Sequence, residues 1–193
     1  MAVNSTMLAL GTAAPDFDLP DPVTGTRVSI DDFVDNKGLL VMFICNHCPY
    51  VQHIRQGLVE LGIDYESRGL GIVAISANDS EQYPTDGPEE MAREAGEFGY
   101  RFPYLYDESQ AVAKAYTAMC TPDFFLFGSD RTLVYRGRFD ETRPNTTAKV
   151  TGADLRASIE AVLNDEPVPD GQLPSMGCSI KWKPGNEPDY FSS

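Results

Sequence analysis

The sequence predicts an α/β fold in which helices pack on a mixed β-sheet. Short apolar runs typical of buried strands alternate with segments of helical periodicity, and this alternation is characteristic of that class. The chain has 193 residues, of which 42% are hydrophobic, so one domain can bury a full core. We find no internal repeat. We expect residues 1–164 to form the domain, and residues 165–193, which are rich in proline and glycine, to form an irregular tail packed on it.

A β-hairpin is predicted near the N-terminus. Residues 17–19 alternate between apolar and polar side chains, and residues 27–30 alternate in the same way. Residues 21–26 lie between them and contain Asp, Pro, Thr and Gly, which favour a turn. The two strands are therefore expected to pair before the chain enters its central part.

A central strand and helix are predicted next. Residues 39–44 form an apolar run typical of a buried parallel strand. The run breaks at Asn46, and Pro49 is suited to the first position of a helix. Apolar residues then recur at helical spacing as far as Leu61. The chain therefore passes from strand to helix between Asn46 and Pro49.

The remaining elements continue the alternation. Further strands are predicted at residues 69–76, 104–106, 124–127 and 133–135. Further helices are predicted at residues 89–98, 109–116 and 154–163. Everything after residue 164 is expected to be irregular.

Cys48 is the candidate reactive residue, because it lies at the junction of the central strand and helix. Free backbone N–H groups and the positive end of the helix dipole favour an anion at that point. Such a position can lower a thiol pKa from about 8.5 to roughly 3.5–7.5, which makes the cysteine a nucleophile at neutral pH. The sequence therefore predicts a reactive thiolate at Cys48.

Three motifs carry a resemblance to a known family. They are Asn46-His47-Cys48-Pro49-Tyr50-Val51, Cys120-Thr121-Pro122-Asp123-Phe124-Phe125 and Gly177-Cys178-Ser179-Ile180-Lys181-Trp182-Lys183. By these motifs the chain resembles thioredoxin-fold proteins of the alkyl hydroperoxide reductase/thiol-specific antioxidant family, and within it the peroxiredoxin-like 1 group. The resemblance runs from Gly11 to about residue 163. It implies a thioredoxin-like three-layer α/β/α sandwich with an N-terminal β-hairpin, and a redox function.

The resemblance also implies roles for the two central cysteines. Thioredoxins and peroxiredoxins place their attacking cysteine at Cys48, and peroxiredoxins follow it with a proline, here Pro49. The resolving cysteine of thioredoxins falls on Val51, which cannot act as one. Cys45 lies three residues before Cys48, where peroxiredoxins have a threonine. We therefore expect Cys45 to be the resolving thiol of a redox-active disulfide.

Thr121 and Pro122 form the second predicted part of the site. A proline cannot donate a hydrogen bond to a sheet, so Pro122 belongs at the start of the strand that follows. Most X-Pro bonds are trans, but the resemblance implies a cis bond here, with Thr121 offering backbone hydrogen bonds to an extended substrate. His47 and Pro49 are expected to complete the substrate-binding surface. His47 either lowers the pKa of its neighbour Cys48 or shapes the loop.

Two further cysteines are candidates for auxiliary roles. Cys120 lies close to Pro122 in sequence, although such a cysteine is more often a small buried hydrophobe. Some peroxiredoxins carry a resolving cysteine in a C-terminal segment, and by this resemblance Cys178 is a second candidate partner for Cys48. The alternative for Cys178 is a packed structural thiol.

Arg138 is a candidate for stabilising the thiolate and orienting a peroxide. Peroxiredoxins use an arginine in this way, and Arg138 or its neighbour Arg136 follows a predicted strand. The alternative is a surface ion pair with Asp140 or Glu141.

Three classes of function remain open, and no cofactor is expected. We favour a thiol–disulfide oxidoreductase, in which Cys48 attacks a disulfide and Cys45 resolves the product. The second class is an antioxidant peroxide reductase, in which Cys48 becomes a sulfenic acid. The missing threonine at Cys45 and the missing proline at Val41 weaken it. The third is a metal-binding or copper-delivery protein, but the copper-assembly relatives use a distant histidine, and His47 and His53 both lie near position 50. No metal is therefore expected.

The charge of the chain excludes several partners. The formal net charge of −14 argues against nucleic acid and anionic membranes. No apolar run approaches the ~18–20 residues of a membrane span, and the first residues lack the pattern of a secretory signal. We therefore expect a cytoplasmic protein, a monomer or homodimer. It would react with protein or small-molecule disulfides or peroxides, and a thiol system such as thioredoxin would recycle it.

Overall fold

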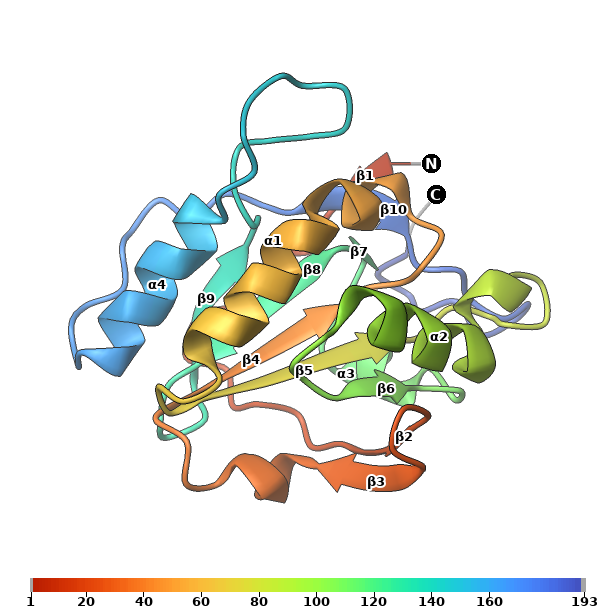
Figure 1. The fold of residues 1–193 in the computed structure, drawn as a ribbon, viewed down its shortest axis with the longest axis horizontal. Coiled ribbons are helices and arrows are strands. Elements are labelled where there is room, and N and C mark those ends of the chain that lie inside the picture. The colour runs from red at the N-terminus through yellow and green to blue at the C-terminus, as the bar shows by residue number, and fades with distance from the viewer. Residues whose placement is uncertain (1, 192–193) are drawn as a thin grey trace.

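A five-stranded mixed sheet forms the centre of the computed structural model, which describes residues 2–191 (Figure 1). Its strand order is β6–β5–β4–β8–β9. The parallel strands are β4 (Gly38–Phe43), β5 (Leu70–Ser76) and β6 (Tyr104–Tyr106). The antiparallel strands are β8 (Asp123–Phe127) and β9 (Leu133–Gly137). The sheet therefore contains every strand that the sequence predicts after the hairpin.

Helices cover both faces of this sheet, as Figure 1 shows. The helices on one face are α1 (Pro49–Tyr65), α2 (Pro88–Phe98) and α4 (Ala153–Leu163), and α3 (Ala111–Ala115) lies on the other. Side chains alternate along β4. Met42 therefore packs on the face covered by α1, α2 and α4, and Val41 packs on the face covered by α3. The predicted sandwich of helices on both faces of a mixed sheet is therefore present.

The predicted N-terminal hairpin is also present. β2 (Asp18–Asp21) pairs antiparallel with β3 (Thr26–Ser29). The buried carboxylate of Asp21 accepts hydrogen bonds from the backbone N–H of Val23 and the hydroxyl of Thr24, at 2.9 and 3.0 Å. These bonds close the turn. A short 3₁₀ helix, η1 (Ile30–Phe33), then leads to the central sheet.

A second, three-stranded sheet joins both ends of the described chain to its middle. β10 (Met176–Ser179) lies between β1 (Ala2–Asn4) and β7 (Cys120–Thr121), and both pairs are antiparallel. Cys178 lies opposite Thr121. Gly177 packs so closely on β7 that a Cβ atom there would overlap the carbonyl oxygen of Thr121. The tail is therefore irregular over most of its length but fixed at this strand.

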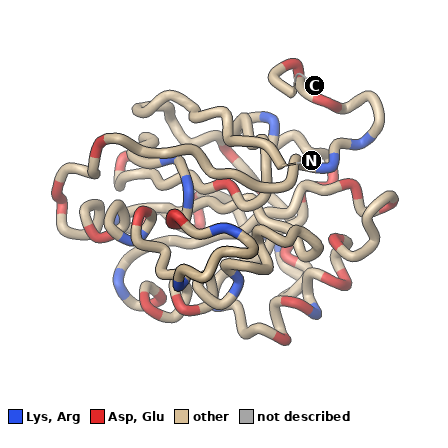
Figure 2. Tube along the Cα trace, turned by 90° about the horizontal axis from the view of Figure 1, so that it is seen from above, with Lys and Arg blue, Asp and Glu red and all other residues tan. Residues whose placement is uncertain are grey.

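Charged residues lie around the whole trace, and the acidic ones do not gather on one side (Figure 2). This distribution agrees with a solvated acidic surface. Among residues 2–191, no helix is both long enough and apolar enough to cross a membrane.

Candidate active site

Cys48 lies where β4 has ended and α1 begins, as the sequence predicts. Its backbone is extended (φ −71°, ψ 120°), and Pro49 occupies the first turn of the helix. The residue is fully buried. Its Sγ lies 3.1 Å from the carbonyl oxygen of Thr121, so the cysteine faces the segment that precedes β8. The peptide bond between Thr121 and Pro122 is cis.

The surroundings of Cys48 favour its thiolate. A hydrogen bond from the Cys45 thiol lowers the pKa of Cys48 to about 4, although burial acts in the opposite direction. Smaller contributions come from Cys178, Thr121 and the backbone N–H of Val51. In the reduced protein these effects favour Cys48 as the thiolate of the pair.

Cys45 is the matching neutral thiol. Its hydrogen bond to Cys48, its burial and the nearby charge of Asp86 raise the pKa of Cys45 well above its ordinary value. The Sγ of Cys45 also lies 3.3 Å from the hydroxyl of Thr121. Thr121 therefore contacts both cysteines, Cys48 through its carbonyl oxygen and Cys45 through its hydroxyl.

Asp86 fixes the loop that carries the two cysteines. It lies at the end of a short 3₁₀ helix, η2 (Pro84–Asp86), and is fully buried. One carboxylate oxygen accepts from the backbone N–H groups of Asn46 and His47, at 2.9 and 3.1 Å. The other accepts from Nδ1 of His47 at 2.5 Å and from the side-chain amide of Asn78 at 2.8 Å. Burial raises the pKa of Asp86, but the bonds from His47 and Asn78 outweigh it and the pKa is lowered.

His47 is held by this carboxylate on one side and by an aromatic ring on the other. Its ring stacks on Tyr83, with centroids 5.3 Å apart. Its Nδ1 lies 4.0 Å from the Sγ of Cys45. The sequence placed His47 beside Cys48, but the structure brings its ring nitrogen to Cys45.

Cys45, His47 and Asp86 could also hold a metal ion. Their ligand atoms lie within 4.8 Å of one another, and thiolate, imidazole and carboxylate are all ligands of Zn²⁺. Sequence reasoning looked for a distant histidine and so did not find Asp86. A metal here would compete with the hydrogen bond between Asp86 and His47 and would remove Cys45 from thiol exchange.

We expect Asp86→Ala to destabilise the reduced protein by about 3 kcal/mol, because it leaves buried donors without an acceptor. Urea unfolding of the variant and of the wild type measures this difference. Asp35→Ala, which removes an exposed carboxylate from a loop, is the control and should leave the free energy of unfolding within about 0.5 kcal/mol. Equal stability of the two variants would show that Asp86 does not fix the loop.

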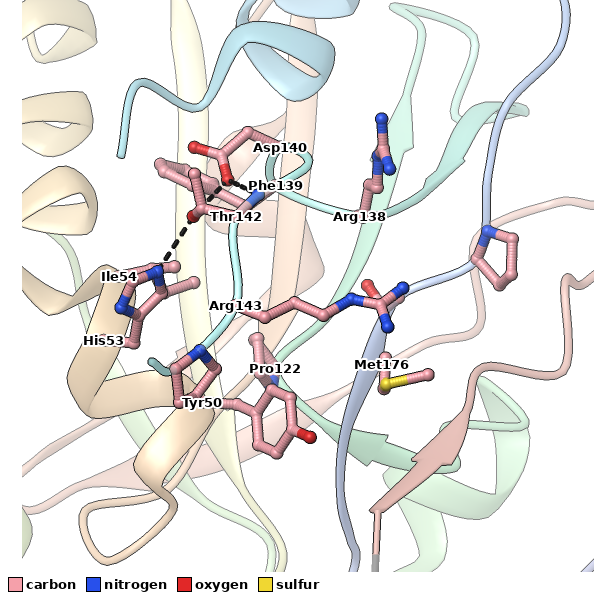
Figure 3. Close-up of a pocket in the computed structure, with 13 residues that line it drawn as sticks. Tyr50, His53, Ile54, Pro122, Arg138, Phe139, Asp140, Thr142, Arg143 and Met176 are labelled. Carbon is pink, nitrogen blue, oxygen red and sulfur yellow. Dashed lines mark hydrogen bonds between the residues drawn. The ribbon is translucent and has the colours of Figure 1, made fainter. Parts of the chain in front are cut away.

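A pocket adjoins the cis proline (Figure 3). Tyr50 and Pro122 line one part of it, and the side chain of Arg143 extends towards Met176. Arg138 also lines the pocket, but its Nε lies 2.5 Å from a carboxylate oxygen of Asp154. The ion pair expected as the alternative role of Arg138 therefore exists, with Asp154 as the partner instead of Asp140 or Glu141.

Asp140 and Arg136 have other partners. The carboxylate of Asp140 accepts hydrogen bonds from Thr142 and from the backbone N–H groups of Thr151 and Gly152. Figure 3 shows its bonds to Thr142. Arg136 donates to the backbone carbonyl of Leu8 and to the side chain of Gln172.

The other two cysteines differ in their surroundings. Cys120 is fully buried, and burial raises its pKa well above the ordinary value. Its Sγ lies 3.5 Å from the carbonyl oxygen of Pro122, which agrees with a packed thiol. Cys178 is only partly buried and lies opposite Thr121. Burial and the neighbouring Cys48 raise the pKa of Cys178 to about 11.

Three of the four thiols therefore converge on one point. We call Cys45, Cys48 and Cys178 the thiol cluster. All four cysteines of the chain are free in this structure. Of the residues singled out from the sequence, the structure brings Thr121 and His47 to this cluster and directs Arg138 to Asp154.

Comparison with known proteins gives a family and close structural relatives. The model of the AhpC/TSA family matches residues 10–136. The crystal structure of an uncharacterized conserved protein from Geobacillus kaustophilus is 52% identical, with 96% of this chain and 98% of that chain covered and a TM-score of 0.94. No curated protein matches the chain significantly.

More distant structures share the fold. The thioredoxin domain of a thiol-disulfide oxidoreductase from Bacteroides vulgatus is 20% identical, with a TM-score of 0.59, and 77% of this chain and 96% of that chain are covered. The peroxidoxin BcpB from Mycobacterium tuberculosis is 18% identical, with a TM-score of 0.58, and 81% of this chain and 96% of that chain are covered. At these identities the likeness establishes the thioredoxin fold alone.

Proposed function

Because the chain belongs to the AhpC/TSA family, we propose that it is a thiol–disulfide oxidoreductase with Cys48 as nucleophile and Cys45 as resolving thiol. One observation carries the proposal. The Sγ atoms of Cys48 and Cys45 lie 3.1 and 3.3 Å from the carbonyl and hydroxyl oxygens of Thr121, and the pKa of Cys48 is lowered to about 4 while that of Cys45 is raised. Thiol–disulfide exchange requires such a difference in pKa, because the thiolate attacks the substrate first and the protonated thiol reacts only in the second, resolving step.

The proposed reaction has two exchange steps. The Cys48 thiolate attacks one sulfur of the substrate disulfide, forms a mixed disulfide and releases the other sulfur as a thiolate. The charge on Cys48 then disappears, and with it the largest cause of the raised pKa of Cys45. Cys45 can now lose its proton and attack Cys48. A Cys45–Cys48 disulfide forms, and the second substrate thiolate leaves with that proton.

The proposed partners follow from this chemistry. Substrates would be protein or small-molecule disulfides, and a thiol reductant of the thioredoxin kind would recycle the protein. Such reductants keep thiols reduced in the cytoplasm, which is the location that we propose. We also propose that residues 1–164 form the redox domain, with residues 165–193 as its tail, in a monomer or homodimer.

Removal of both thiols that face Cys48 should trap the intermediate. We expect the double variant Cys45→Ser/Cys178→Ser to attack hydroxyethyl disulfide once and then to keep the mixed disulfide on Cys48, because no resolving sulfur remains. Cys178→Ser alone is the matched control and should go on to the Cys45–Cys48 disulfide. Intact mass after acid quenching measures both species. If the control keeps the adduct as well, Cys45 is not the resolving thiol.

The burial of Cys48 favours peroxide reduction as a second candidate function, since hydrogen peroxide is smaller than any disulfide. In that reaction Cys48 would become a sulfenic acid and condense with a neighbouring thiol. Breakage of the O–O bond needs donors that stabilise charge on the leaving oxygen. Arg138 is paired with Asp154, and a thiol, a weak donor, replaces the threonine hydroxyl at Cys45.

We therefore expect peroxide to oxidise Cys48 slowly. Stopped-flow measurement with hydrogen peroxide should give a second-order rate constant below about 10⁵ M⁻¹s⁻¹, which is near the lower end of enzyme efficiencies. Arg138→Gln should change the constant little, because its guanidinium is directed at Asp154. A constant above that limit would make peroxide reduction the main function.

A further inference from the structure

The members of the thiol cluster differ in their access to solvent. Cys45 is 1% exposed and Cys48 is 0% exposed, whereas Cys178 is only partly buried. An external thiolate can reduce a disulfide only by contacting one of its sulfurs. Both sulfurs of a Cys45–Cys48 disulfide would therefore be less accessible to a recycling thiol than Cys178 is.

Strand β10 places the more exposed sulfur next to the buried nucleophile. Cys178 lies opposite Thr121, whose carbonyl oxygen is 3.1 Å from the Sγ of Cys48. Interaction between the two thiols raises the pKa of Cys178 and lowers that of Cys48. The close packing of Gly177 on Thr121 fixes the register, because a larger residue would not fit. The pairing of β10 with β7 therefore places Cys178 beside the residue that contacts Cys48.

We propose that Cys178 connects the buried disulfide with external reductants, by exchanging with the Cys45–Cys48 disulfide and presenting a Cys48–Cys178 disulfide to a dithiol. This inference rests on the proposed function and adds the route by which electrons enter. It gives the tail a chemical role, because Cys178 is the one member of the thiol cluster that is not buried.

The exchange balances at each step. Cys178 attacks the Sγ of Cys48, the Cys48–Cys178 bond forms and the Cys45–Cys48 bond breaks, and the proton of Cys178 passes to Cys45. An external thiolate then attacks the Sγ of Cys178, and Cys48 leaves as a thiolate. The second thiol of the reductant attacks its partner sulfur in the mixed disulfide and frees Cys178. One dithiol is oxidised, and one protein disulfide is reduced.

The chemistry of the two sulfurs favours attack at Cys178. In thiol–disulfide exchange the thiol of lower pKa leaves faster. Cys48 has a pKa of about 4 in the reduced protein and Cys178 has one of about 11. The greater exposure of Cys178 and the lower pKa of Cys48 therefore both favour attack on Cys178 with Cys48 as the leaving group.

The rate of reduction tests the proposal. Reduced protein is oxidised with one equivalent of diamide, and the rate at which dithiothreitol restores free thiols is measured by quenched alkylation and intact mass. We expect Cys178→Ser to be reduced at least about 10-fold more slowly than the wild type, because both sulfurs of its disulfide are buried. Ser179→Ala, a change at the next residue of β10, is the matched control and should be reduced at the wild-type rate.

Each other outcome contradicts a specific claim. Reduction of Cys178→Ser at the wild-type rate would overturn the connecting role of Cys178. A Cys178→Ser chain that forms no Cys45–Cys48 disulfide would overturn the resolving role of Cys45, and with it the first exchange step. Failure of Cys48 to react in any variant would overturn the proposed function itself.

Strand geometry provides a second, independent test. Gly177→Ala should displace β10 from β7, so peptide mapping of the oxidised variant should find the Cys48–Cys178 link reduced at least about 5-fold relative to the wild type. Gly96→Ala is the matched control, because a Cβ atom at that position in α2 meets no atom within 4 Å. A wild-type map without any Cys48–Cys178 link, or an undiminished link in Gly177→Ala, would contradict the geometric basis of the proposal.

Discussion

Cys48→Ser should lower the rate of thiol–disulfide exchange by at least about 10³-fold, the largest effect that we expect from any single substitution. Serine cannot replace the thiolate as a nucleophile here, because a hydroxyl stays protonated at a pH where the Cys48 thiol is ionised. The reduction of hydroxyethyl disulfide, with dithiothreitol as the recycling thiol, measures the rate. Because Cys48 makes the attack on the substrate and is the sulfur that Cys45 and Cys178 later attack, neither of those thiols can start the reaction without it.

Cys120→Ser is the matched control for this prediction. The same atom is changed in a fully buried cysteine whose Sγ lies 3.5 Å from the carbonyl oxygen of Pro122. The control should retain most of the activity. If Cys48→Ser and Cys120→Ser lose equal activity, the loss reflects a damaged core, and Cys48 is not identified as the nucleophile.

The second large effect concerns pH. Alkylation of Cys48 by iodoacetamide should be nearly independent of pH between about 5.5 and 8, whereas an ordinary thiol with a pKa of about 8.5 reacts about 10-fold faster per pH unit in that range. The lowered pKa of about 4 means that the thiolate fraction is almost complete above pH 5.5 and falls only as the pH drops towards 4. Burial slows the reaction but does not change the shape of the profile.

Cys45→Ala should restore the ordinary dependence on pH. It removes the hydrogen bond that contributes most to lowering the pKa of Cys48 while burial, which raises that pKa, remains. Mass spectrometry of each alkylated cysteine over the pH series separates the four thiols. If Cys45 or Cys178 becomes a thiolate at lower pH than Cys48, the assignment of Cys48 as the nucleophile is wrong.

The position of Cys48 could be predicted from the sequence because its causes are local. An apolar strand, a break at Asn46 and a proline at the start of a helix are neighbours in the chain, and together they place the thiol at a helix N-terminus. The same local patterns gave the hairpin and the helices. The cis bond before Pro122 could be expected only by resemblance, because general X-Pro statistics favour trans.

The contacts of Asp86 and Cys178 could not be predicted in this way, because they join segments far apart in the chain. Asp86 lies in a loop whose composition is typical of a turn, and nothing local shows that its carboxylate is buried against His47. Cys178 reaches Cys48 only because β10 enters the sheet beside β7. Arg138 has acidic residues close to it in sequence, but the fold brings Asp154, which is more distant in sequence, to its guanidinium.

Changes to the chain near strand β1 should alter how readily the thiol cluster is oxidised. This strand is three residues long, it is the outer neighbour of β10, and it sets Ala2 opposite Cys178. Proteolytic trimming near Ala2, or an affinity tag joined there, would loosen the strand that holds β10 against β7. Preparations that differ only at this end of the chain would then differ in how readily they are oxidised and stored, although every residue of the thiol cluster is unchanged.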